Sequence, residues 1–121
     1  FQAEDGIRYS VASRGLGDVY KRQDLGANVI KIEPPMGEPW RHASPSVPPG
    51  ESRLFIALNR GKKSVCIDLK SEEGQDVCHR LVSQADAVIS NNRKDTSEKL
   101  KYDHISLSKI NPKLVYVEST A

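Results

Sequence analysis

The stretch that decides the fold is residues 64–90, SVCIDLKSEEGQDVCHRLVSQADAVIS. Its first five residues, Ser64–Asp68, form a short β-branched and apolar run that is typical of a strand. Its last four, Ala87–Ser90, predict a second strand of the same kind. Between them Ser71 offers a helix N-cap, and the next two residues are glutamates, which suit the positive end of a helix dipole. The helix continues with an apolar stripe that is not quite regular, formed by Val77, Cys78, Leu81 and Val82.

The same alternation continues on both sides of this unit. Towards the N-terminus, residues 24–27 resemble a helix end, with Gly26 able to take the left-handed terminal position. A β-branched strand, Asn28–Glu33, follows and is stopped by two prolines. Towards the C-terminus, Asp95 or Thr96 can cap a short helix through Leu100. Asp103 can cap another helix through Ile110, and a fourth strand is expected at residues 114–117.

Strands that alternate with helices predict an α/β fold, a parallel sheet with right-handed crossovers and flanking helices. We expect this domain to be incomplete, because nothing closes the far side of the sheet. The chain also stops at Ala121, directly after a strand, as a truncated reading frame would.

The composition excludes several classes of protein. A net charge of +2 is too small for the basic stripe of a nucleic-acid-binding surface, and no apolar run approaches the roughly 18 residues of a membrane span. Two cysteines do not make a disulfide framework, so we expect a cytoplasmic protein. Cys66 and Cys78 fit best as small core residues, and the three histidines share no spacing that predicts a metal site.

Residues 1–23, FQAEDGIRYSVASRGLGDVYKRQ, differ from the rest of the chain. They show no helical or alternating apolar period and no signal-peptide core. The pieces FQAEDGIR and DVYKRQ resemble translated sequencing adapter. We therefore expect 1–23 to be a non-native, disordered segment that packs against nothing, with a natural N-terminus as the alternative. Residues 24–121 are then the domain to interpret.

Two other segments lie between the expected strands. Residues 36–52 are rich in Pro, Gly and Ser and predict a long loop, a kind of segment that is often functional in compact domains. Within it, Trp40 is expected to anchor the loop through its indole. One or two helical turns are expected at residues 53–58. The basic residues 59–63 then predict a tight turn, with Gly61 at positive φ.

Three stretches carry a family resemblance: DLGANVIKIEPP at 24–35, LNRGKKSVCIDLK at 58–70 and INPKLVYV at 110–117. In this order and spacing they resemble the family III CoA-transferases, the CaiB/BaiF-like proteins. Formyl-CoA and carnitine CoA-transferases and methylacyl-CoA racemases belong to this group. The resemblance covers nearly everything from Asp24 onwards, so 24–121 is interpreted as the N-terminal part of the coenzyme A-binding domain.

The resemblance implies a Rossmann-like domain in an interlocked homodimer that binds coenzyme A as an acyl-CoA and transfers it to a carboxylic acid. In the transferases an aspartate takes the acyl group as a mixed anhydride and then carries coenzyme A as a thioester. That aspartate lies downstream of the Asn-Pro-Lys-Leu stretch, beyond Ala121. No residue of this chain is therefore expected to be catalytic, and the chain alone is expected to be inactive.

The resemblance also implies positions that contact coenzyme A. The strand end Ile67, Asp68, Leu69 and Lys70 matches a family segment that runs along the adenine nucleotide. Asn91 matches a family Asn, whereas Asn92 replaces the usual Phe and Arg93 begins a departure from the usual small-Pro-Gly turn. Lys99 and Leu100 match a basic and an apolar position. Pro34 replaces an Arg found in some members, so that contact is absent. The alternative for the lysines and arginines is that they are ordinary solvated surface charges.

Other functions are weighed against this one. A racemase or epimerase of the same family would need a general acid-base pair, which would also lie downstream. A dinucleotide-binding domain is excluded because no Gly-x-Gly-x-x-Gly follows a strand. The last alternative is an inactive fragment with no independent function. The acyl group and the acceptor acid are not encoded in this part of the sequence.

Overall fold

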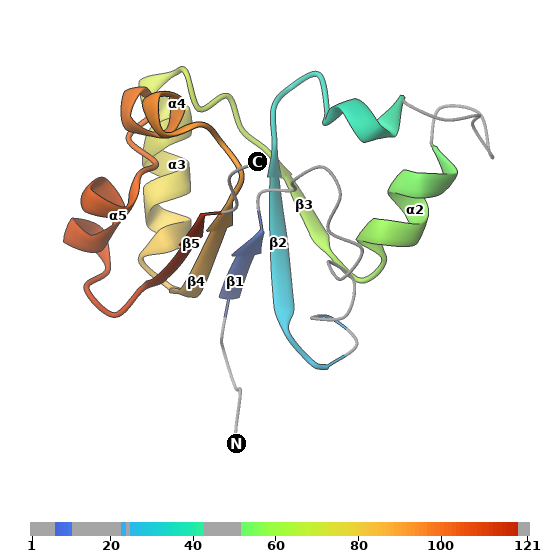
Figure 1. Ribbon diagram of the computed structural model, residues 1–121, viewed down its shortest axis with the longest axis horizontal. Helices are drawn as coiled ribbons and strands as arrows, with labels where there is room; N and C mark the ends of the chain where they lie inside the picture. The colour runs from blue at the N-terminus through green and yellow to red at the C-terminus, as the bar shows by residue number, and fades with distance from the viewer. Residues whose placement is uncertain (1–6, 11–22, 24, 43–51, 119–121) are drawn as a thin grey trace.

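The fold is a parallel sheet with helices on its two faces, seen in a computed structural model that describes residues 7–10, 23, 25–42 and 52–118 (Figure 1). All four neighbouring pairs of strands are parallel, which confirms the α/β prediction. The strands lie side by side in the order β3 (Lys63–Cys66), β2 (Asn28–Glu33), β1 (Ile7–Ser10), β4 (Ala85–Ser90) and β5 (Val115–Glu118).

The helical elements of the described residues are η1 (Pro39–Arg41), α2 (Arg53–Asn59), α3 (Glu72–Val82), α4 (Lys94–Lys99) and α5 (His104–Ile110). The helices α3 and α5 begin where their capping signals place them. The expected caps of α3 and α5 are confirmed: Ser71 Oγ accepts from the Gly74 N–H at 3.0 Å, and Asp103 Oδ1 accepts from the Ser106 N–H at 3.0 Å. The prediction that Asp95 or Thr96 caps α4 is wrong, because the carbonyl of Arg93 already accepts the Ser97 N–H and no side chain caps the helix.

The N-terminal segment corrects an expectation. Residues 7–10 form β1, the central strand, which pairs with β2 on one side and β4 on the other. The prediction that 1–23 is disordered and packs against nothing is therefore wrong for these four residues. Four residues are too few to show an apolar period, and the pairing uses backbone groups that any residue except proline supplies. Residues 1–6 and 11–22 lie outside the described residues, and the adapter origin stays a prediction.

The strand β2 separates two environments by simple alternation. Ile30 and Ile32 enter the hydrophobic core together with Cys78 and Val82 of α3. The intervening residues, of which Lys31 and Glu33 carry charge, point to the opposite face, towards η1 and α2. Since successive side chains of a strand point to opposite faces, β2 is buried on both sides but apolar on only one.

The remaining boundaries differ by a few residues from the expected ones. β3 ends at Cys66, so Ile67 and Asp68 lie beyond the strand, although the Ile67 N–H still donates to the Glu33 carbonyl at 2.8 Å. Gly26 and Gly61 have φ values of +90° and +74°, so both take the left-handed conformation expected of them, and the tight turn at Gly61 is confirmed. The expected loop at 36–52 contains η1, and its part at 43–51 lies outside the described residues.

Candidate functional site

The strand order places a candidate ligand site at one edge of the sheet. Strands β2 and β3 lie on one side of β1, and the chain then crosses to the other side of β1, where β4 and β5 lie. Because open α/β sheets bind ligands at the carboxyl ends of their strands, where the order reverses, the crevice is expected at the ends of β1 and β4. Two of the predicted segments, 67–70 and 91–93, leave from this edge, directly after β3 and β4.

The first segment, Ile67–Lys70, is a turn with its side chains divided between the core and the surface. Ile67 is 6% exposed and belongs to the core cluster, against which Leu69 also packs. Asp68 and Lys70 are exposed, and Asp68 Oδ1 accepts from the Lys70 N–H at 3.0 Å. A ligand at this turn would therefore contact the backbone and the side chains of Asp68 and Lys70, while the apolar side chains hold the turn in place.

The second segment follows β4. Ser90 is fully buried at the strand end, and its Oγ accepts from the Asn92 N–H at 3.2 Å. Asn91 and Asn92 are half-buried, as wall residues would be. Arg93 is exposed and lies 3.4 Å from the Asp95 carboxylate, an exposed pair of little energetic weight. The Arg93 guanidinium thus follows the end of β4 at the candidate edge, with its charge partly offset by Asp95.

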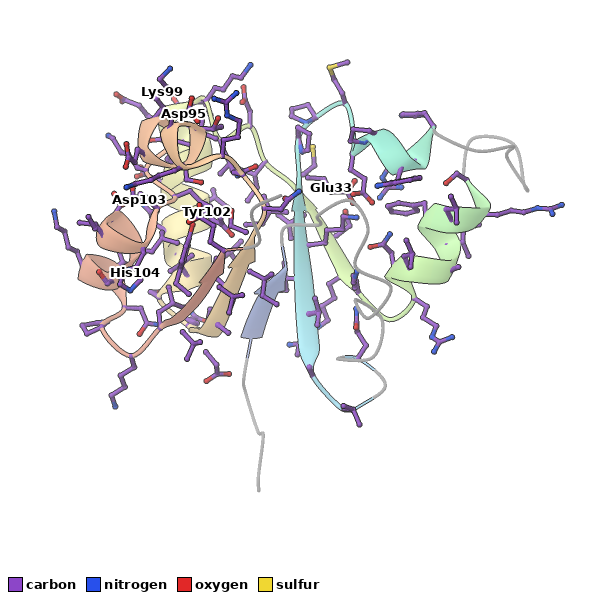
Figure 2. The ribbon with its side chains drawn as sticks, in the orientation of Figure 1. Glu33, Asp95, Lys99, Tyr102, Asp103 and His104 are labelled. Atoms are coloured by element: carbon purple, nitrogen blue, oxygen red, sulfur yellow. The ribbon has the colours of Figure 1, made fainter. Side chains whose placement is uncertain are left out.

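Lys99 and Leu100, the remaining residues predicted to contact coenzyme A, lie at the C-terminal end of α4. Lys99 is exposed, whereas Leu100 packs against the core. Figure 2 shows Lys99 and Asp95 on α4, well separated from Glu33 at the end of β2. The structure thus places Lys70, Arg93 and Lys99 on the surface, and their convergence around one groove stays a prediction.

Sequence reasoning missed an ion pair that organises the end of β2. The Glu33 carboxylate, which is 3% exposed, accepts from Arg41 Nε at 2.7 Å and Arg41 Nη2 at 2.8 Å. It also accepts from Ser64 Oγ at 3.1 Å and the Glu38 N–H at 3.3 Å. Burial alone raises the pKa of this carboxyl, but the hydrogen bonds from Arg41, Glu38 and Ser64 and the Arg41 charge outweigh it, and the pKa lies below its ordinary value of 4.5.

A second buried pair lies beside the first. Lys31, only 2% exposed, donates to Glu38 Oε1 and, at 3.0 Å, to Asn59 Oδ1. Both cations lie over the Phe55 ring: Lys31 Nζ is 4.8 Å and the Arg41 guanidinium carbon 3.9 Å from its centroid. Burial lowers the pKa of Lys31 against the opposing effect of Glu38. The charges of Lys31 and Arg41 are thus compensated by Glu38 and Glu33, and these contacts hold η1 and α2 against β2.

A hollow of about 290 Å³ opens next to the Glu33–Arg41 pair. It is lined by Glu33 at the end of β2, by Ser64 and Cys66 of β3 and by Arg41 of η1. The rest of its lining comes from Pro34, Pro35, Met36, Gly37 and His42. The predicted residues 67–70, 91–93, 99 and 100 do not line it, so this hollow adds residues of β2 and η1 to the candidate edge.

A smaller hollow of about 200 Å³ lies beyond β5, between α4 and α5. Asp103 and His104, labelled in Figure 2, line it together with Tyr116. The ring centroids of His104 and Tyr116 are 5.7 Å apart. Slight burial raises the pKa of Asp103, but the hydrogen bonds from Ser106 and nearby backbone lower it further, so the carboxyl is ionised as a helix cap requires. The Tyr116 hydroxyl donates to the Tyr102 carbonyl at 3.3 Å, so the tyrosine joins β5 to the α4–α5 turn.

The two cysteines lie in different environments. Burial raises the pKa of Cys78 to about 12, which agrees with the predicted core role. The same prediction is wrong for Cys66, which is exposed because it ends β3, a strand at the edge of the sheet. Within the described ranges, no three His, Cys, Asp or Glu side chains are grouped closely enough to hold a metal ion. None of the described helices is long and apolar enough to cross a membrane.

Residues 23–121 match the sequence profile described as CoA-transferase family III. The chain is 45% identical over 101 residues to the "Probable fatty acyl-CoA transferase Rv3272" of Mycobacterium tuberculosis, an alignment that covers 81% of this chain and 25% of that protein. It is 38% identical to the succinate–glutarate CoA-transferase of Agrobacterium fabrum, with 95% of this chain and 31% of that protein covered.

Solved structures agree with the sequence matches. A crystal structure of Rv3272 superposes with a TM-score of 0.83 at 37% identity, covering 97% of this chain and 34% of that one. A CAIB/BAIF family protein from Brucella suis superposes with a TM-score of 0.84 at 37% identity, covering 93% of this chain and 32% of that one. The chain thus spans about a quarter to a third of the length of the relatives that it matches.

Proposed function

The chain belongs to CoA-transferase family III, and we propose that it forms the coenzyme A-binding part of an acyl-CoA:carboxylate CoA-transferase. The observation that carries the proposal is the strand order β3-β2-β1-β4-β5, all parallel, with the segments 67–70 and 91–93 leaving from its carboxyl edge. An open sheet with this order binds nucleotide-like ligands at that edge. Relatives named as CoA-transferases favour a transferase over a racemase.

The two segments suggest how the ligand is arranged. The first turn of α3 carries Glu72 and Glu73, whose charges oppose phosphate groups at this helix end. The turn 68–70 is therefore better suited to the adenosine part of coenzyme A, and the phosphates are better placed towards Arg93 and Lys99. Asn91 and Asn92 would form the wall between these two regions, as half-buried amides that can donate and accept hydrogen bonds.

The transfer itself would use a carboxylate from the part of the parent protein that this chain does not span. We propose that this aspartate attacks the acyl-CoA carbonyl, which releases coenzyme A as a thiolate and forms a mixed anhydride. The thiolate then attacks the aspartyl carbonyl and releases the acyl group as a carboxylate. The acceptor acid takes coenzyme A by the same two steps in reverse. Residues 24–121 contribute binding energy and orientation to this sequence.

The direct test is calorimetric titration of the chain with coenzyme A. We expect saturable binding without any acyl transfer from acetyl-CoA to a carboxylic acid. Lys99→Ala should weaken binding about 5- to 150-fold, the equivalent of about 1–3 kcal/mol for a charge-assisted hydrogen bond. Lys113→Ala is the matched control, because Lys113 is exposed just before β5, at the opposite edge of the sheet.

The possible outcomes separate the function from the site. A folded chain that does not bind coenzyme A would contradict the proposed function. Binding that is equally strong in the Lys99 and Lys113 variants would leave the function intact and remove Lys99 from the site. Acyl transfer by the chain alone would contradict the proposal that the nucleophile lies outside it.

A further inference from the structure

Helix α3 lies unusually close to the turn that precedes it, at Gly74. A Cβ atom on Gly74 would lie 1.9 Å from the carbonyl oxygen of Asp68, 2.7 Å from its carbonyl carbon and 2.9 Å from Ser71 Oγ. Side-chain carbons do not approach backbone oxygens closer than about 3.0 Å. Only glycine therefore permits this packing, even though glycine costs a helix about 1 kcal/mol relative to alanine.

The turn is held to α3 by hydrogen bonds as well as by contact. The Asp68 carbonyl accepts from the Ser71 N–H at 3.1 Å and from Ser71 Oγ at 2.9 Å. Ser71 Oγ in turn accepts from the Gly74 N–H at 3.0 Å, and Gln75 Nε2 donates to the Leu69 carbonyl at 3.0 Å. The carbonyls of Asp68 and Leu69 are thus both bound by groups at the start of the helix.

This arrangement fixes which side chains the turn presents. Leu69 packs against the core, so the turn cannot rotate about its own axis without exposing apolar surface. Asp68 and Lys70 are left on the exposed side, and the Asp68 carboxylate accepts the Lys70 N–H. The turn is consequently ordered before any ligand arrives, which lowers the entropy cost of binding.

We infer that Gly74 is a positioning residue for the proposed coenzyme A site: its missing side chain lets the Asp68 carbonyl rest on α3 and so sets the place of the turn 68–70. The inference rests on the proposed function, and it assigns a role to a residue that is not itself expected to contact the ligand. To reach 3.0 Å from a new Cβ, the Asp68 oxygen must move by about 1.1 Å, the difference between 3.0 and 1.9 Å.

The experiment compares Gly74→Ala with Leu81→Ala in the full chain. Leu81 is on the same helix and packs against the core, so its truncation destabilises the fold without touching the turn. Coenzyme A titrations are run at a temperature at which circular dichroism shows that both variants are folded. We expect Gly74→Ala to raise the Kd about 10-fold or more and Leu81→Ala to leave it within about 2-fold.

A milder variant keeps the inference open to refutation if Gly74→Ala does not fold. Ser71→Ala removes the hydroxyl that links the Asp68 carbonyl to the Gly74 N–H and should raise the Kd several-fold. An unchanged Kd in whichever of the two variants folds, or an equal loss in Leu81→Ala, would overturn the inference while leaving the proposed function in place. A wild-type chain that binds no coenzyme A would instead overturn the proposed function, and the inference with it.

Discussion

Replacing Glu33 with Gln tests the ion-pair network at the end of β2. The substitution keeps the size of the side chain and removes its charge, while Arg41 stays in place above the Phe55 ring. A Gln amide has one acceptor oxygen and one N–H₂ donor, so one of the two hydrogen bonds from Arg41 loses its charge assistance and the other is lost, because two donors then face each other. The bond from Ser64 or from Glu38 to the replaced oxygen meets the same N–H₂ group.

The size of the effect follows from burial. Breaking a fully buried ion pair costs about 3–5 kcal/mol. The Arg41 side chain is 25% exposed, however, so water compensates part of its lost partner. We therefore expect Glu33→Gln to lower the free energy of unfolding by about 2–3 kcal/mol at pH 7, a large share of the roughly 5–15 kcal/mol typical of a domain.

The pH dependence provides a sharper measurement. The pKa of Glu33 is lowered in the folded chain relative to its ordinary 4.5, so its stabilisation is complete above about pH 4.5 and is lost as the pH falls through the folded value. Urea unfolding of the wild type and of Glu33→Gln at several pH values gives the difference between their free energies of unfolding. This difference should be constant near neutrality and should shrink below pH 4.5.

The matched control is Glu98→Gln, at an exposed position on α4, which should change stability by less than about 0.5 kcal/mol. A Glu33 variant as stable as the wild type at pH 7 would show that the network contributes no net stability. A stability difference that persists unchanged well below the pKa of Glu33 in the folded chain would show that the lost stability comes from packing and not from charge.

Three further predictions concern stability and reactivity. Lys101 has a φ of +54° after α4, so Lys101→Gly should raise the free energy of unfolding by about 0.5–1 kcal/mol in urea titrations; a loss would mean that the lysine side chain stabilises this turn. The Asn111 amide donates to the carbonyls of Val82 and Ala85 at 3.1 and 2.7 Å, so Asn111→Ala should cost about 1–3 kcal/mol in the same assay, and a neutral result would show that water replaces both bonds. A thiol reagent should label the exposed Cys66 within the folded chain and Cys78 only on unfolding; fast labelling of both would contradict the core packing of α3.

Much of the fold could be predicted because local signals and the hydrophobic period agree along residues 24–121. Ser71 and Asp103 cap their helices as expected, since a cap depends on residues only three positions apart. Strands β2 to β5 were each found from short β-branched or apolar runs, and the alternation with helices led to the parallel sheet. The candidate edge follows from the same reasoning, because the carboxyl ends of parallel strands share one side.

What only the tertiary structure decided are the side-chain contacts that the path of a loop sets, whether the partners are seven positions apart, as Lys31 and Glu38 are, or 28, as Lys31 and Asn59 are. Alternation along a strand puts Lys31 and Glu33 on the opposite face of β2 from Ile30 and Ile32. It does not show that Glu38, Arg41 and Asn59 meet those charges. Pairing of this kind depends on the path of a loop, for which local propensity carries little information. A glycine in the first turn of a helix, such as Gly74, is a weak signal by itself, and only the position of the Asp68 carbonyl against it explains the residue. The central strand β1 was not predicted because backbone hydrogen bonds hold it between its two neighbours. Backbone groups are the same in every sequence, so this pairing leaves no pattern of side chains.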